Sequence, residues 1–305
     1  MGRWGFPAAE NPAKTGGKGQ RMQEIKGDPA IRVVTLLENT AEREDLAFAH
    51  GLSLYIETPR HKILFDMGPN EDFLANAEQL GVDLAAVDLA ILSHGHYDHS
   101  GGLAAFCRKN STAPIYLREG AFGAYYALEG GAEPRYIGLD PALIEFRDRF
   151  HFTKKETVID EELTLFACPP MDFDALGASA MLQEQTPEGF RPDQFAHEQN
   201  LLVTAAGRSL LVAGCAHRGV VNILAEGRRR LAGDVQVLFG GFHLFEMDPK
   251  DPESLALIDA TGQALLLGET IYYTGHCTGP AAYQQLSGIL GTRLRPMSGG
   301  GDVRW

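Results

Sequence analysis

Short apolar runs open the chain and predict strands over Ile31–Leu37, Ser53–Glu57 and Lys62–Phe65. Only the turn-like stretch Thr58–His61 separates the last two runs, so we expect them to pair as a hairpin. Further along, Asp72–Leu80 places its apolar residues at helical spacing and is followed by a glycine, which predicts a short helix. The chain therefore begins with antiparallel strands and continues with a helix.

The second half repeats this order, with hairpin-like strands followed by alternating strands and helices. Strand–helix alternation of this kind predicts mixed sheets with helices packed outside them. The remaining predicted strands are Leu89–Leu92, Ile115–Leu117, Leu163–Ala167, Leu201–Ala205, Ser209–Ala213, Val235–Phe239 and Ile271–Tyr273, and the remaining predicted helices are Val220–Leu231 and Pro280–Leu290.

The charge and cysteine content of the chain limit the kinds of binding partner that we expect. The chain has 305 residues, and its 27 Lys and Arg against 40 Asp and Glu give a formal charge of -13. That balance argues against nucleic acid and against an anionic membrane as partners, because both attract a basic footprint. Four cysteines are too few for a disulfide scaffold. Residues 1–27 contain no apolar run, so we expect a flexible N-terminal extension without a secretory signal, and a cytoplasmic protein.

Candidate chemistry is concentrated directly after the strand predicted at Leu89–Leu92. His94, His96, Asp98 and His99 lie within six residues there. Imidazole and carboxylate groups suit zinc, iron or manganese. Side chains two apart on an extended segment point to one side, so His94 and His96 are expected to share a side. Asp98 and His99 follow as the chain turns, where they could face a second metal ion. A surface cluster without function is the alternative, and the buried strand in front of it argues against that.

Six residues cannot complete two metal sites, so further ligands are expected later in the chain. His217, His243 and His276 each follow a predicted strand and a glycine. The ends of strands in mixed α/β sheets carry functional sites. Each of these histidines alone would more often belong to a core or a loop, but their repetition after separate strands favours a shared site.

These motifs resemble a known family. His94-x-His96-x-Asp98-His99 resembles the signature of the metallo-β-lactamase superfamily. The surrounding motifs are similar to one branch, the metal-dependent hydrolases related to the archaeal dihydropterin–ribofuranosylaminobenzene 5′-phosphate synthase of methanopterin biosynthesis. They are His50-Gly51-Leu52-Ser53, Leu64–Gly68, Ser93–Leu103, Gly214-Cys215-Ala216-His217, Gly240–Leu244 and Gly275–Gly279.

The resemblance implies an α/β (α+β) fold, a four-layer αββα sandwich with a dinuclear metal site at one edge. It implies a single domain over residues 28–305, with a pocket-forming insert at about 104–196. The metal ions would be two divalent ions per chain, with zinc as the first choice and iron or manganese as alternatives. The partner would be a small-molecule substrate.

The resemblance also assigns roles to individual residues. It places His94, His96 and His217 on the first metal and Asp98, His99 and His276 on the second, with Asp66 orienting a ligand imidazole. Other members carry a bridging aspartate where this chain has Cys215, so the thiol is either a ligand or a small buried residue. His197 is a reserve ligand. The resemblance leaves His243 to the pocket, as a proton donor or substrate contact, or to a structural role.

The implied activity is hydrolysis, in which hydroxide held by the two metals attacks a small phosphorylated, ester or lactone substrate. Asp98 could also accept the proton of the water. Arg118, Arg135 and Lys154 or Lys155 are candidate anion contacts, with a solvated surface position as the alternative for each. Two other functions use the same residues: condensation of a dihydropterin pyrophosphate with an aminobenzene ribofuranosyl phosphate by a synthase, and metal binding by a non-catalytic sensor.

Overall fold

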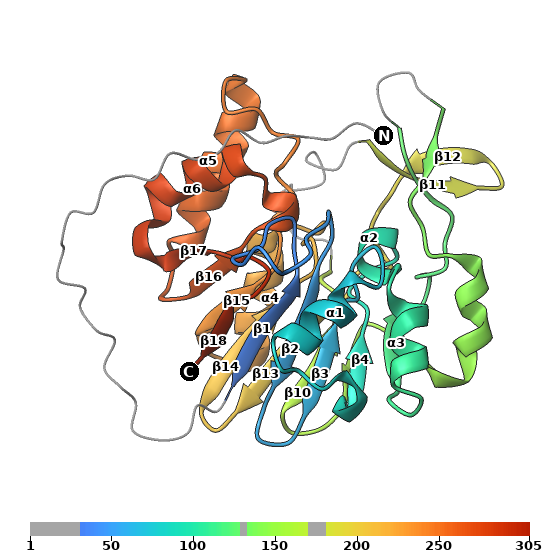
Figure 1. Ribbon diagram of the computed structural model, residues 1–305. Helices are drawn as coiled ribbons and strands as arrows, with labels where there is room; N and C mark the ends of the chain where they lie inside the picture. The colour runs from blue at the N-terminus through green and yellow to red at the C-terminus, as the bar shows by residue number, and fades with distance from the viewer. Residues whose placement is uncertain (1–30, 129–132, 170–180) are drawn as a thin grey trace.

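The computed structural model of the chain describes residues 31–128, 133–169 and 181–305. Two seven-stranded sheets pack face to face at its centre, and helices cover the outer face of each sheet (Figure 1). Residues 1–27, for which we expect a flexible extension, lie outside the described residues. None of the helices in the described ranges combines the length and the apolar character that crossing a membrane requires.

The first sheet has the strand order β18-β1-β2-β3-β4-β5-β8. Strands β18, β1, β2 and β3 pair antiparallel, whereas β3, β4, β5 and β8 pair parallel. The strand bounds are β1 Arg32–Leu37, β2 Ser53–Glu57, β3 Lys62–Phe65, β4 Leu89–Ile91, β5 Ile115–Arg118, β8 Phe150–Thr153 and β18 Asp302–Arg304.

The second sheet has the order β17-β16-β15-β14-β13-β10-β9 and repeats the same mixture. Strands β9, β10, β13 and β14 pair antiparallel, and β14, β15, β16 and β17 pair parallel. The strand bounds are β9 Glu156–Val158, β10 Leu163–Phe166, β13 Asn200–Ala205, β14 Arg208–Val212, β15 Val237–Phe239, β16 Ile271–Thr274 and β17 Leu294–Pro296.

Three hydrophobic clusters hold the layers together. One packs the outer face of the first sheet against α1 and α3, a second lies between the two sheets, and a third packs the second sheet against α4, α5 and α6. Burial of apolar side chains on both faces of each sheet is the main stabilising contribution. The predicted four-layer αββα sandwich is confirmed. The helix bounds are α1 Asp72–Gln79, α2 Tyr97–Ser100, α3 Leu103–Lys109, α4 Val220–Leu231, α5 Pro252–Leu265 and α6 Pro280–Leu290.

The stretch 104–196, expected to be a pocket-forming insert, divides between three sheets. Strands β5 and β8 complete the first sheet, and β9 and β10 belong to the second. Among the described strands of this stretch, those of a four-stranded sheet of order β12-β11-β6-β7 lie outside the sandwich, and a small cluster that includes Tyr125, Leu182 and Phe195 packs this sheet. Its strands are β6 Tyr125–Ala127, β7 Arg135–Tyr136, β11 Leu182–Thr186 and β12 Gly189–Pro192.

Parallel strands bring the candidate residues to one edge. The loops after β3, β4, β14, β15 and β16 carry Asp66, His94, His217, His243 and His276 respectively. Because the carboxyl ends of parallel strands meet at the same edge of a sheet, and the two sheets face each other, these loops converge. The fold therefore gathers residues from segments that are far apart in the chain.

Candidate metal centre

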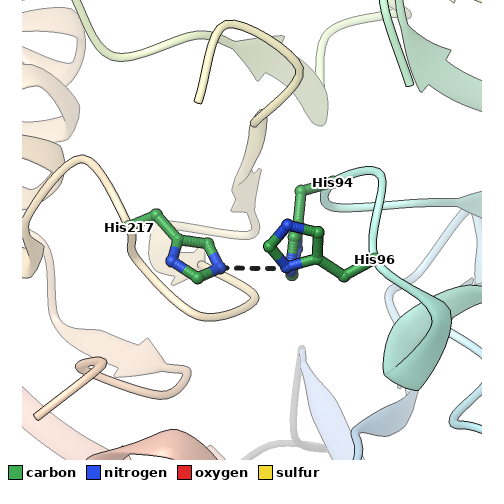
Figure 2. A group of neighbouring side chains, drawn as sticks. All are labelled: His94, His96 and His217. Carbon is green, nitrogen blue, oxygen red and sulfur yellow. Dashed lines mark hydrogen bonds between the residues drawn. The ribbon is translucent and has the colours of Figure 1, made fainter. Parts of the chain in front are cut away.

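Three imidazoles form the first candidate metal set. His94 and His96 come from the loop after β4, and His217 comes from the loop after β14 (Figure 2). One ring nitrogen from each lies within 4.8 Å of the others, and all three side chains are buried. The Nε2 atoms of His94 and His217 are 3.3 Å apart. Two imidazole nitrogens bound tetrahedrally at about 2.0–2.1 Å from zinc would lie about 3.3–3.4 Å apart, so this spacing fits a shared ion.

Asp66 fixes the orientation of two imidazoles. Its carboxylate is fully buried and accepts hydrogen bonds from Nδ1 of His99 at 2.7 Å and from the Ser93 hydroxyl at 2.7 Å. Because that hydroxyl donates to Asp66, its oxygen accepts from Nδ1 of His94 at 2.8 Å. Asp66 therefore keeps a proton on Nδ1 of both imidazoles and turns their Nε2 atoms into the site. Gly214 lies against these hydrogen bonds, and a Cβ at this position would clash with the Ser93 hydroxyl.

Asp98, His99 and His276 form the second set, with the carboxylate in the middle. Oδ2 of Asp98 lies 3.7 Å from Nε2 of His99 and 3.4 Å from Nε2 of His276. Nδ1 of His276 is 2.9 Å from Oδ1 of Asn39 and donates to it, which leaves the lone pair of Nε2 facing a carboxylate. That contact is repulsive unless a cation or proton lies between the two atoms. The second set therefore also fits a metal ion.

Burial and neighbouring charges shift the ionisation of these groups. Burial lowers the pKa of His96 to about 3, and burial with the neighbouring imidazoles holds the pKa values of His94 and His217 well below their usual range. These imidazoles are neutral at pH 7, which is the form that binds metal. Burial opposes charge on His99 too, but the carboxylates of Asp66 and Asp98 raise its pKa to about 9. A metal ion would compete with that proton for Nε2.

Two polar nitrogen atoms test the fit directly. Among the described buried side chains, Nε2 of His96 and Nε2 of His276 have no hydrogen-bond partner. A buried polar atom without a partner costs about 1–3 kcal/mol, so such atoms are retained where a ligand satisfies them. One of the two lies in each predicted set. The donor groups of both sets therefore suit divalent metal ions with nitrogen and oxygen preferences.

The loop after β1 supplies residues that the sequence reasoning missed. Glu38 accepts the backbone N–H of His276, and Asn39 holds the imidazole of the same residue. Asn39 also lies 3.3 Å from Nδ1 of His50, whose Nε2 is 3.5 Å from Asp98. The motif around His50 was noticed but given no role. Glu38 and Asn39 directly follow the predicted strand Ile31–Leu37, and their position at a strand end was the available signal.

The loop bearing His217 has its own support. The ring of Phe195 stacks on that of His217 with a centroid separation of 4.3 Å and an interplanar angle of 1°. Glu198 accepts the backbone N–H groups of His217 and Arg218 at 2.7 and 3.1 Å. Burial raises the pKa of Glu198 to about 7. The ring stacking and the backbone hydrogen bonds together fix the position of the His217 imidazole.

His197 and Cys215, the two reserve ligands, lie in different surroundings. Nδ1 of His197 accepts the backbone N–H of Gly95 at 2.8 Å, and its Nε2 is 3.0 Å from Oδ2 of Asp193. A metal could reach His197 only by displacing one of these partners. Sγ of Cys215, in contrast, lies 3.1 Å from Nε2 of His99 and faces the second set.

A cavity of about 370 Å³ opens over both sets. Its lining includes His96, Asp98, His217 and His243 at the bottom and Arg135 from β7 of the small sheet. His243 is buried, and its ring centroid is 4.2 Å from that of His217. The described cavity lining does not include the other candidate anion contacts: Arg118 donates to the carbonyl oxygens of Ala196 and Thr153, and Lys154 and Lys155 lie elsewhere. The cavity size suits a small-molecule ligand.

Left-handed backbone marks the strand ends around this cavity. Asp66, His243 and His276 have φ angles of 58°, 47° and 47°. Non-glycine residues adopt this region rarely and at a cost of about 1–3 kcal/mol, and such residues cluster at functional sites. Local strain therefore coincides with the cavity and with both candidate metal sets.

The chain is similar to several known proteins. A synthase of Methanocaldococcus jannaschii, 7,8-dihydropterin-6-methyl-4-(beta-D-ribofuranosyl)-aminobenzene-5'-phosphate synthase, is 28% identical over 278 residues, which cover 82% of this chain and 88% of that protein. An uncharacterised protein of the same organism is 28% identical over 214 residues, 68% of this chain and 78% of that one. The crystal structure of Tm1679, described as a metal-dependent hydrolase of the beta-lactamase superfamily, matches with a TM-score of 0.74 and 26% identity, covering 90% of this chain and 99% of that chain.

A sequence profile of the metallo-beta-lactamase superfamily matches residues 47–276. That range includes His94, His96, Asp98 and His99, and it extends to His276. The match covers most of the chain and agrees with the four-layer fold. The protein belongs to the metallo-beta-lactamase superfamily.

Proposed function

We propose that this protein is a metal-dependent hydrolase of small anionic substrates. The observation that carries the proposal is the grouping of three imidazoles beside the contacts of Asp98 with His99 and His276, next to one cavity. His94, His96 and His217 would hold one divalent ion, and Asp98, His99 and His276 the other. Zinc is the first choice, with iron or manganese as alternatives, because imidazole and carboxylate ligands accept all three.

When bound, two such ions would lower the pKa of a water molecule and stabilise negative charge that develops on the substrate. The chain's own residues keep the ligands in place. Asp66 holds the imidazoles of His99 and, through Ser93, of His94 with their Nε2 atoms toward the ions. Asn39 does the same for His276. Such outer partners typically contribute a factor of 10–100 in metal affinity or activity.

Two residues are placed to move protons. Burial would raise the pKa of Asp98, but the neighbouring imidazoles of His99 and His276 hold it well below its usual range. Asp98 is therefore an ionised carboxylate that could accept a proton from the attacking water. His243 lies at the bottom of the cavity beside His217, and we assign to it donation of a proton to the leaving group.

The cavity lining supports an anionic substrate. Arg135 brings a guanidinium group to the lining of an otherwise acidic protein, and such a group pairs well with phosphate or carboxylate. Tyr97 and Phe245 add exposed aromatic surface beside it. A phosphoester with an apolar or aromatic body fits this lining better than a nucleic acid chain would. The four cysteines are free and buried, which suits a reducing compartment such as the cytoplasm.

A second candidate is supported by the resemblance to the synthase of Methanocaldococcus jannaschii. In that reaction class, an aminobenzene nucleophile replaces water and displaces the pyrophosphate of a dihydropterin. The same metal ligands and the same arginine would serve, because pyrophosphate is also an anionic leaving group. The two functions differ only in whether the cavity admits a second organic substrate.

The test is a substrate screen of the full-length protein reconstituted with zinc, manganese or iron. Phosphodiesters, phosphomonoesters and lactones are assayed for hydrolysis, and a dihydropterin pyrophosphate is assayed with and without the aminobenzene phosphate. Metal-dependent hydrolysis that a chelator abolishes supports the first candidate, and turnover only with both organic substrates supports the second. Failure to bind at least one metal ion per chain would overturn both.

Arg135 provides a matched test of the substrate class. Arg135→Ala is expected to raise KM for phosphorylated substrates by about 10-fold or more, the range of one charge-assisted contact of about 1.5–3 kcal/mol. Arg135→Lys keeps the charge and should recover part of the loss. Hydrolysis of an uncharged lactone should be unaffected in both variants. Equal losses for charged and uncharged substrates would contradict the anion-binding role.

A further inference from the structure

Two thiols lie beside the second metal set. Cys215 follows β14 and Cys277 follows β16, and both side chains are buried and contribute to the cavity lining. Sγ of Cys277 donates to the carbonyl oxygen of Cys215 at 3.6 Å, and Sγ of Cys215 lies 3.1 Å from Nε2 of His99. Together with a ring nitrogen of His276, the two sulfur atoms form a group whose members all lie within 4.8 Å of one another.

The other two cysteines lie in different surroundings. Cys107 packs in the hydrophobic cluster beneath α3, and Cys168 packs in the cluster beneath α4, α5 and α6. Buried free cysteines of that kind behave as small apolar side chains. Cys215 and Cys277 instead lie beside the imidazoles of His99 and His276 in the lining of the cavity. Gly241 leaves the room that Cys277 occupies, because a Cβ there would clash with its sulfur atom.

We propose that Cys277 is a metal ligand of the second set, acting with Cys215. This inference rests on the proposed function only in requiring that the second set binds a metal. The site would then combine sulfur, nitrogen and oxygen ligands, whereas the first set offers imidazoles alone. Each thiol would release its proton to solvent as the metal binds. Thiolate ligands favour zinc over manganese and magnesium, so this pair would bias the second site toward zinc.

The experiment that needs no variant is X-ray absorption at the zinc edge of the full-length protein loaded with two zinc ions. Two thiolates on one of two ions give an average of about one sulfur per zinc at about 2.3 Å. If Cys215 were the only sulfur ligand, the average would fall to about half a sulfur per zinc. Either that half value or the absence of a sulfur shell overturns the assignment of Cys277.

Cobalt substitution tests the residue directly. Cobalt bound to thiolate gives a ligand-to-metal charge-transfer band in the near ultraviolet, and nitrogen or oxygen ligands alone do not. Cys277→Ala and Cys215→Ala should each lose roughly half of the band, and the double variant all of it, since each thiolate contributes separately. Cys107→Ala and Cys168→Ala are matched controls that should keep the wild-type band. Circular dichroism and Tm of each metal-free variant confirm folding.

The outcomes separate this inference from the proposed function. Cobalt that binds with its visible bands but without a charge-transfer band would overturn the thiolate ligands and leave the hydrolase proposal intact. A band that Cys215→Ala removes completely and Cys277→Ala leaves unchanged would overturn the role of Cys277 alone. Absence of any cobalt binding would overturn both proposals together.

Discussion

The two metal sets differ in how the chain builds them. The first set uses three imidazoles from two loops, and all three are buried and backed by aromatic or hydrogen-bonding neighbours. In the second set, Asp98 and His99 come from the short helix α2 and His276 from the segment after β16, and the loop after β1 holds His276 in position. Half-exposed His50 lies at its open side, with 52% of its side chain exposed. All six side chains of the two sets are buried, so the sets differ in their neighbours and charges rather than in burial.

This difference predicts different metal binding. Neutral, fixed imidazoles need little rearrangement to bind an ion, so the first set is expected to bind its metal more tightly. The second set must displace a proton from His99, whose pKa Asp66 and Asp98 raise to about 9. Solvent also reaches its open side. We therefore expect a chelator to remove one metal ion per chain before the other.

Removing a ligand from the first set should have the largest effect on metal content and activity. His96→Ala deletes a buried imidazole whose Nε2 has no partner other than the expected metal. The first ion should be lost and activity should fall by more than the roughly 10–100-fold typical of outer-partner variants. His276→Ala should instead lose only the second ion. Metal analysis of both purified variants checks this, and a full complement in either would show that its ligand assignment is wrong.

The contrast between the sets also explains which site residues the sequence alone could predict. His94, His96, Asp98 and His99 share one short segment after a strand, so their pattern was visible without a structure. Helix α4 was predicted with its observed bounds because its periodicity is strong, whereas α5 was missed although Asp251 and Pro252 are ordinary start signals. Hydrophobic patterning predicted mixed sheets with helices outside them, whereas the four-layer sandwich followed from the family resemblance.

Contacts between distant segments were beyond the sequence. Asn39 and His276 are 237 positions apart, and their loops meet because β1 and β16 belong to two sheets that pack face to face. The interaction of Cys215 with Cys277 likewise depends on β15 separating their strands by one position. Within the stretch 104–196, strand pairing distributes β5 and β8 to the first sheet and β9 and β10 to the second. Which strands pair with each other depends on the whole chain, and local sequence patterns do not contain that information.

Asp66→Asn should produce the next largest effect, and it should lower the metal affinity of both sets rather than of one. The carboxylate orients His99 directly and His94 through Ser93, so one substitution reaches both sets. Affinity for both ions should fall by about 10–100-fold, the range found for outer partners of metal-ligating histidines. Asparagine tolerates the left-handed φ of this position, so backbone strain is matched. Titration with a competing chelator measures both affinities, and loss at only one set would contradict the shared role.

Asn39→Ala should give the smallest effect and confine it to the second set. The substitution removes the oxygen that accepts from Nδ1 of His276 at 2.9 Å, while the first set keeps all of its contacts. Affinity for the second ion should fall by about 10-fold, the low end of the range for such partners, because Glu38 still holds the backbone of His276. Asn39→Asp keeps an acceptor at this position and should restore most of the affinity. If Asn39→Ala lowered the affinity for both ions equally, the two sets would be coupled through the loop after β1. The interpretation of the two sets as independent sites would then be wrong.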